Sequence, residues 1–189
     1  FQLQDVVMQI GGLHNIENAL AAFTVCYTMN LDLEKAKACF ANFKGIKRRF
    51  EYIVKATNSI YIDDYAHHPA ELETLIKSAK NLYPNKKCLV VFQPHLFSRT
   101  KDLVDGFAAS LSLADELIIL PIYPARELPM EGVTSEIILS AMKVKKGAVL
   151  SKEATLRYIQ DHAIELLITA GAGDIDQLIQ PIKTILESK

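Results

Sequence analysis

The chain has 189 residues, half of them apolar, with 21 basic and 22 acidic side chains and a net charge of −1. This balance gives no electrostatic reason to expect nucleic acid or an anionic membrane surface as a partner, and the apolar content excludes a disordered chain. No apolar run approaches the roughly 20 residues that a membrane-spanning helix needs, and the first residues lack the basic segment of a signal peptide.

The cysteines indicate a reducing, cytoplasmic compartment. Cys26, Cys39 and Cys88 are odd in number, far apart and set in apolar surroundings, so we expect buried free thiols and no disulfide frame or metal site. The chain begins with Phe1 and not with Met. We therefore expect a fragment of a longer protein.

Two helices dominate the first part of the chain. The apolar run around Val6 predicts a strand over residues 1–10, which Gly11 interrupts. Apolar residues at three- and four-residue spacing predict a helix over residues 15–29. Asp32 is typical of the N-cap of a second helix, which ends near Asn42.

These first residues are too few to hold a core of their own. We expect residues 1–46 to complete a domain whose bulk lies upstream, and residues 47–189 to form a second domain.

Apolar strands alternate with helices in the second part, which indicates a doubly wound, mostly parallel, Rossmann-like α/β sheet. The predicted strands cover residues 52–55, 60–64, 87–92, 116–120, 148–150 and 166–170. The predicted helices cover residues 69–83, 100–113, 135–142, 152–162 and 175–186.

Two carboxylates and two imidazoles follow the second predicted strand: Asp63, Asp64, His67 and His68. In a parallel α/β sheet, ligands bind at the carboxyl ends of the strands. The alternative is that the acidic pair only caps the helix that Pro69 opens.

Other strand ends carry polar residues too, which together predict one ligand-binding rim. These residues are Gln93, His95, Ser98 and Arg99 after the third strand, Tyr123, Arg126 and Glu127 after the fourth, and Gly171, Gly173 and Asp174 after the last. The two glycines suit a turn that lets a ligand approach backbone N–H groups.

The chemistry of this rim suits positioning of an anionic substrate and stabilisation of negative charge. The chain has no nucleophile elbow, no His-Glu-x-x-His zinc pattern and no phosphate-binding loop, so we expect the phosphate loop of any nucleotide-dependent reaction outside this chain. Adjacent residues point in different directions, so we expect no metal site among the carboxylates and imidazoles.

A further polar pair opens the first helix. His14 and Asn18 lie four residues apart, so they share one side of its first turn. An amide can bond an adenine edge and an imidazole can stack on the base. The alternative, which cap preferences favour for the pair taken alone, is an N-cap followed by a solvated polar turn.

The chain resembles the Mur ligases over nearly its whole length, because it contains six motifs in the order in which that family has them. They are Gly-Leu-His-Asn-Ile-Glu-Asn-Ala-Leu-Ala-Ala at 12–22, Arg-Arg-Phe-Glu at 48–51, Asp-Asp-Tyr-Ala-His-His-Pro at 63–69, Phe-Gln-Pro-His-Leu-Phe-Ser-Arg-Thr at 92–100, Tyr-Pro-Ala-Arg-Glu at 123–127 and Gly-Ala-Gly-Asp-Ile at 171–175.

The resemblance implies that residues 1–46 end a central ATP-binding domain and that residues 47–189 form the C-terminal Rossmann-like domain. It implies ATP-dependent amide formation through an acyl phosphate, with UDP-N-acetylmuramate and L-alanine as substrates and with ATP and Mg²⁺, whose ligands lie mostly upstream. The fragment alone would be inactive. The murein-peptide recycling branch of the family, and a Rossmann-like binding module without chemistry, are the alternatives.

The resemblance also assigns roles to single residues. It places His14 and Asn18 on adenine, Arg49 on the nucleotide phosphates and Asp64 on the ribose. It places Tyr65, His67, His68, His95 and Arg99 at the amino-acid and muramyl end, with His67, His95 and Arg99 as the catalytic group. Many family members carry arginine where this chain has Leu96, and Arg126 is a candidate to replace that guanidinium.

Overall fold

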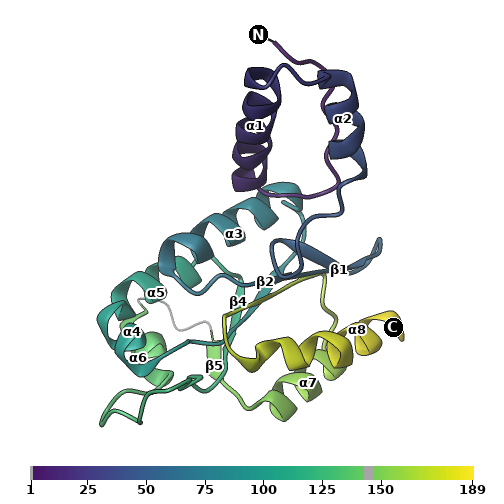
Figure 1. The fold of residues 1–189 in the computed structure, drawn as a ribbon. Helices are drawn as coiled ribbons and strands as arrows, with labels where there is room; N and C mark the ends of the chain where they lie inside the picture. The colour runs from purple at the N-terminus through teal and green to yellow at the C-terminus, as the bar shows by residue number, and fades with distance from the viewer. Residues whose placement is uncertain (1, 143–146) are drawn as a thin grey trace.

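A six-stranded sheet forms the centre of the computed structural model (Figure 1). The structure describes residues 2–142 and 147–189 except for the side chains of Leu13 and His14. The strands lie in the order β1-β2-β6-β3-β4-β5. β1 runs antiparallel to β2, and all other neighbours pair in parallel. The predicted, mostly parallel α/β sheet is therefore confirmed.

The strands are β1 (Glu51–Lys55), β2 (Ile60–Asp64), β3 (Cys88–Phe92), β4 (Glu116–Ile119), β5 (Gly147–Val149) and β6 (Leu166–Ala170). The helices are α1 (Leu13–Thr28), α2 (Leu33–Asn42), α3 (Pro69–Leu82), α4 (Phe97–Asp102), α5 (Val104–Leu111), α6 (Glu136–Ala141), α7 (Lys152–Asp161) and α8 (Ile179–Glu187), with a 3-10 turn η1 (Asp174–Leu178) before α8. Each predicted strand of the sheet lies within one residue of the observed one.

The sheet has an apolar core on each face because its central strands are buried throughout. Every residue of β2, β3 and β6 is buried. One core contains Leu72 of α3 and Phe107 of α5, while the other contains Ile159 of α7 and Ile182 of α8. Helices therefore cover both faces, which leaves the strand ends as the place for polar groups.

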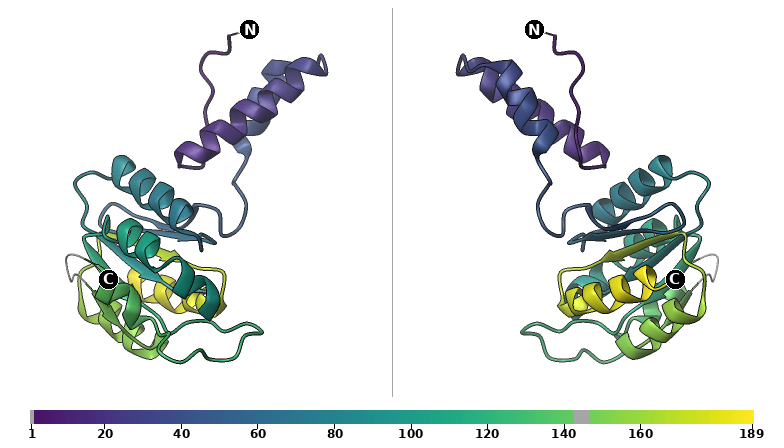
Figure 2. Two further views of the ribbon diagram at one scale, coloured as in Figure 1. Left: turned by 90° about the vertical axis from the view of Figure 1, so that its left-hand side faces the viewer. Right: turned by 90° about the vertical axis from the view of Figure 1, so that its right-hand side faces the viewer.

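A hairpin of α1 and α2 projects away from the sheet (Figure 2). Phe23 and Phe40 stack between the two helices with ring centroids 4.3 Å apart. The Asp32 carboxylate accepts hydrogen bonds from the first turn of α2, as predicted for an N-cap. Ile16 and Leu20 stay more than half exposed on α1. Within the described chain, no helix combines the length and apolar character needed to cross a membrane.

The strand predicted over residues 1–10 is wrong. Residues 2–8 form no regular structure, and Asp5 has a φ of 59°, which breaks an extended run. The prediction of three buried thiols also fails in part. Cys88 is buried and Cys26 partly so, but Cys39 is exposed because α2 contains no buried residue in the described structure.

Two predicted helices begin or end elsewhere. The helix expected over residues 100–113 begins earlier, at Phe97, and is divided into α4 and α5 at Leu103. The helix expected over residues 175–186 begins as a 3-10 turn, and its α-helical part begins at Ile179. Pro181 explains this start, because a residue without an N–H is tolerated only in the first turn of an α-helix.

Candidate functional site

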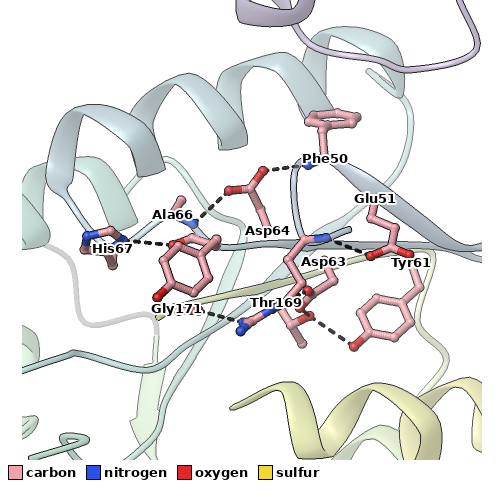
Figure 3. A network of polar contacts seen from close by, with 11 residues as sticks. Phe50, Glu51, Tyr61, Asp63, Asp64, Ala66, His67, Thr169 and Gly171 are labelled. Atoms are coloured by element: carbon pink, nitrogen blue, oxygen red, sulfur yellow. Dashed lines mark hydrogen bonds and ion pairs between the residues drawn. The ribbon is translucent and has the colours of Figure 1, made fainter. Parts of the chain in front are cut away.

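A buried ion pair lies at the carboxyl end of β2 (Figure 3). The Asp63 carboxylate is fully buried and lies 3.0 Å from Nε of Arg48. It also accepts a hydrogen bond of 2.6 Å from the Thr169 hydroxyl, which in turn lies 3.0 Å from the Tyr61 hydroxyl. This network joins the segment before β1 to the ends of β2 and β6.

Arg48 extends this network to the rim. Its guanidinium donates 2.6 Å to the Gly171 carbonyl and lies 5.2 Å from the centre of the Tyr65 ring. Its own carbonyl accepts from the Tyr65 N–H at 2.7 Å. Arg48 therefore holds two rim segments at once, and its φ of 58° turns the chain toward them.

Burial raises the pKa of Asp63 to about 6, although the Thr169 hydroxyl and the Arg48 charge act in the opposite direction. A carboxyl group in apolar surroundings resists ionisation unless a cation compensates it. The stability of this strand end therefore depends on Arg48.

Asp64 connects two neighbouring segments. It is buried, and its Oδ2 accepts from the Phe50 N–H while its Oδ1 accepts from the Ala66 N–H, both at 2.7 Å. Phe50 follows Arg49, and Ala66 precedes His67, so one carboxylate fixes the chain beside both predicted site residues. The contact of Asp64 with a ribose stays a prediction.

Aromatic rings line the rim in a row. His67 lies 5.4 Å from Tyr65 and 6.3 Å from His95, and His95 stacks on Tyr123 at 5.7 Å, measured between ring centroids. The His67 Nδ1 lies 3.0 Å from the Tyr65 carbonyl. The structure thus brings together rim residues that lie on different loops in the sequence.

The first turn of α4 is held by a distant loop. The Glu127 carboxylate accepts from both the N–H and the hydroxyl of Ser98, and the hydroxyl contact is the main reason why the pKa of Glu127 is lowered. Leu96 precedes the helix with a φ of 71°. Arg99 therefore lies on a helix and not in the predicted loop, one turn from His95.

Gln93 marks a second polar group at the strand ends. Its Nε2 donates 2.7 Å to Asp174, and Lys152 pairs with Asp174 at 2.6 Å. Burial alone would raise the pKa of Asp174, but the hydrogen bonds from Lys152 and Gln93 lower it. Gly173 packs directly against Gln93 and Tyr123.

Substituting Gly173 by alanine should displace Tyr123. The added Cβ would lie 2.5 Å from Oε1 of Gln93 and 2.7 Å from Cβ of Tyr123, so we expect a loss of about 1–3 kcal/mol in the free energy of unfolding from overpacking. Chemical denaturation measures the loss, and the ring signals of His95 should shift. Gly132→Ala is the comparison, because no atom of the described residues lies within 4 Å of that Cβ and the backbone strain at φ 74° is the cost that remains. Equal shifts at His95 in both variants would contradict this contact.

A cavity of about 460 Å³ lies against the α1–α2 hairpin. Asn18 and the exposed Arg49 line it together with apolar side chains such as Phe40 and Ile46. These are two of the residues assigned to the nucleotide. Of the other two, Asp64 lies at the end of β2, and His14 has a side chain outside the described residues while its backbone lies in the first turn of α1.

The predicted residues thus form two groups. Asn18 and Arg49 line the cavity, and the rim contains Tyr65, His67, His95, Gly171 and Gly173, with Arg99 on α4 close enough to His95 to affect its pKa. His68 and Arg126 are exposed beside the rim, at the start of α3 and in the loop after β4.

Sequence reasoning missed Arg48, Thr169 and Lys152. Thr169 interrupts an otherwise apolar strand, and such a buried hydroxyl requires a partner. Lys152 follows β5, so the rule of strand ends applies to it too. No cluster of three or more metal-ligating side chains occurs within residues 2–142 and 147–189 where side chains are described.

Comparison with known proteins identifies the family. The family described as Mur ligase, glutamate ligase domain, matches residues 48–176. A UDP-N-acetylmuramate–L-alanine ligase of Cytophaga hutchinsonii is 48% identical over 98% of this chain and 40% of its own length. One from Porphyromonas gingivalis is 42% identical over 99% of this chain and 41% of its own length. The chain thus spans about two fifths of these relatives.

Solved structures agree with this assignment. The UDP-N-acetylmuramate-alanine ligase of Thermotoga maritima is 28% identical, with a TM-score of 0.78 over 96% of this chain and 39% of that one. A murein peptide ligase of Psychrobacter arcticus is 27% identical, with a TM-score of 0.65 over 97% of this chain and 39% of that one. The parallel sheet, the strand-end residues and these similarities together show that the chain belongs to the Mur ligase family, whose glutamate ligase domain covers most of its length.

Proposed function

We propose that this chain is part of an ATP-dependent ligase that joins L-alanine to UDP-N-acetylmuramate through an acyl phosphate. One observation carries the proposal: Asp64 fixes, side by side, the segment of Arg49 at the cavity and the segment of His67 at the rim. A nucleotide bound at the cavity and an acceptor bound at the rim would thereby share one rigid support. The names of the relatives support this assignment of substrates.

The cavity suits a nucleotide. Asn18 offers an amide for an adenine edge and Arg49 a guanidinium for phosphates, among apolar side chains that suit the base. We infer that His14 takes part in binding adenine, that Asp64 faces the ribose and that Mg²⁺ accompanies ATP with ligands mostly from an upstream domain. Residues 1–46 would then end the ATP-binding domain, and residues 47–189 would form the C-terminal one.

The rim suits the acceptor and the carboxyl group that reacts with it. Arg99 supplies a positive charge, and the imidazoles of His67 and His95 supply hydrogen bonds to oxygens that become more negative during the reaction. The remaining contacts with the substrates would come from the side chains of Tyr65, His68 and Arg126 and from the backbone at Gly171 and Gly173.

The proposal can be tested with a chimeric ligase in which this chain replaces the matching part of the Cytophaga hutchinsonii relative. With ATP, Mg²⁺ and UDP-N-acetylmuramate present, we expect phosphate release that requires L-alanine. If a tripeptide and not L-alanine supports the reaction, the chain belongs to a murein-peptide ligase. If neither acceptor supports it while the chimera is folded and binds ATP, the chain is a binding module.

Asn18→Ala in the chimeric ligase should raise the KM for ATP roughly 5- to 100-fold, the effect of losing about 1–3 kcal/mol of contact with a base edge. The KM for L-alanine should stay unchanged because the rim is intact. Glu17→Ala is the matched control, since this neighbouring side chain is exposed and does not line the cavity. An unchanged KM for ATP in Asn18→Ala would remove the cavity from the proposal.

A further inference from the structure

The two nitrogens of the His95 ring lie in different surroundings. Nδ1 is buried and has no hydrogen-bond partner in the described structure. The ring is only partly buried, stacks on Tyr123 and lies 6.3 Å from the His67 ring across the rim. A ligand at the rim can therefore reach His95 only through the Nε2 side.

Protonation of both ring nitrogens would leave an N–H without a partner at Nδ1. A buried donor without a hydrogen-bond partner is unfavourable, and more so when the group is charged. The neutral tautomer with hydrogen on Nδ1 carries the same unsatisfied donor. The tautomer with hydrogen on Nε2 leaves only a ring lone pair buried and keeps the donor at the accessible nitrogen.

The surroundings of His95 also disfavour its charged form. Burial lowers the pKa of His95, and the charges of Arg99 on α4 and of His67 on the loop before α3 lower it further. Glu127, on the loop after β4, raises it, but its carboxylate is held by Ser98. Tyr123 contributes a ring face and no charge at neutral pH.

We propose that His95 is a neutral imidazole with its proton on Nε2, which donates a hydrogen bond to a substrate oxygen and does not deprotonate the amine. Its only lone pair lies on the buried Nδ1, so it cannot accept a proton from a group bound at the rim. The tautomer follows from the chain alone, whereas the role as donor in amide formation rests on the proposed function. Another group must then take the proton of the acceptor amine.

Long-range ¹H–¹⁵N spectra of the ligand-free chain test the tautomer directly. Near pH 7 we expect Nδ1 of His95 to show the signal of an unprotonated ring nitrogen and Nε2 that of a protonated one, with a titration midpoint below the ordinary value of about 6.5. His95→Ala assigns the signals. A proton on Nδ1, or a doubly protonated ring near pH 7, would overturn the proposal whether or not the chain belongs to a ligase.

Two amide substitutions in the chimeric ligase separate a donor from a base. His95→Gln keeps an N–H near the position of Nε2 but cannot act as a base, whereas His95→Asn places its amide near Nδ1. If His95 is a donor, His95→Gln should retain at least about tenfold more kcat than His95→Asn and His95→Ala, with the pH profile of the parent, because one hydrogen bond to a charged group is worth about 1.5–3 kcal/mol. An equal loss of kcat in all three variants would contradict the donor role, and so would the loss of one limb of the pH profile in His95→Gln.

Discussion

Arg48→Met should lower the free energy of unfolding by about 3–5 kcal/mol near pH 8, which is the cost of leaving a buried charge without its partner. Among the described residues, the fully buried Asp63 would then keep only the hydrogen bond from Thr169 to compensate its charge. The Gly171 carbonyl and the Tyr65 ring would lose their contacts with the guanidinium as well. Urea unfolding followed by circular dichroism measures the loss.

The loss should depend on pH. The folded pKa of Asp63 is raised from 3.8 to about 6, so the folded protein binds this proton more tightly than the unfolded chain. The contribution of Asp63 to stability is therefore largest below about pH 4 and decreases as the pH rises through about 6. Without Arg48 the pKa of Asp63 should rise further, so the decrease should extend to higher pH, and Arg48→Met and the parent should differ much less near pH 4 than near pH 8.

Two further variants make this prediction specific. Arg49→Met removes the neighbouring guanidinium, which is exposed, and should change stability by less than about 0.5 kcal/mol. Adding Asp63→Asn to Arg48→Met removes the uncompensated charge and should recover part of the loss at high pH. If Arg48→Met were as stable as Arg49→Met near pH 8, the ion pair would not support the strand end.

Arg99→Ala in the chimeric ligase should lower kcat by on the order of 10²–10³, as expected for the loss of one group that stabilises developing negative charge. Arg99 lies on α4 close enough to lower the pKa of His95. Within residues 2–142 and 147–189, no carboxylate lies within ion-pair distance of Arg99, so its charge is available to an anionic substrate. Steady-state kinetics with L-alanine and UDP-N-acetylmuramate measures the effect.

The neighbouring cations are the controls for this experiment. Lys101→Ala removes an exposed charge from the same helix and should leave kcat unchanged. Arg126→Ala should have a smaller effect than Arg99→Ala, because Arg126 is exposed in the loop after β4. Arg99→Lys should recover part of the rate, since the charge is kept without the planar fork. Unchanged turnover in Arg99→Ala would exclude the charge-stabilising role.

The local sequence was sufficient for the sheet. Continuous apolar runs in β2, β3 and β6 can be buried only by covering both faces with helices, so their pattern predicts parallel strands. The rim could also be located from the sequence, because parallel strands bring their carboxyl ends, where ligands bind, to one edge of the sheet. The Asp32 cap is equally local, since it involves only the next three residues.

Tertiary contacts decided the features that the sequence left open. Helix α4 begins at Phe97 because Glu127, 29 residues after Ser98, satisfies the first turn from another loop. The sequence also does not distinguish two adjacent arginines. Only the fold shows that Arg48 turns inward to Asp63 while Arg49 stays exposed at the cavity.

The group of Asp63, Asp64, His67 and His68 at the end of β2 shows the same division. Its position at the end of a strand follows from the sequence, because the apolar run of β2 stops there. The roles of its members depend on burial, which a sequence does not contain: Asp63 is enclosed and paired, Asp64 binds two backbone N–H groups, and His67 reaches the rim. The sequence thus determined which groups meet at this edge of the sheet, and packing decided which of their side chains stay accessible to a substrate.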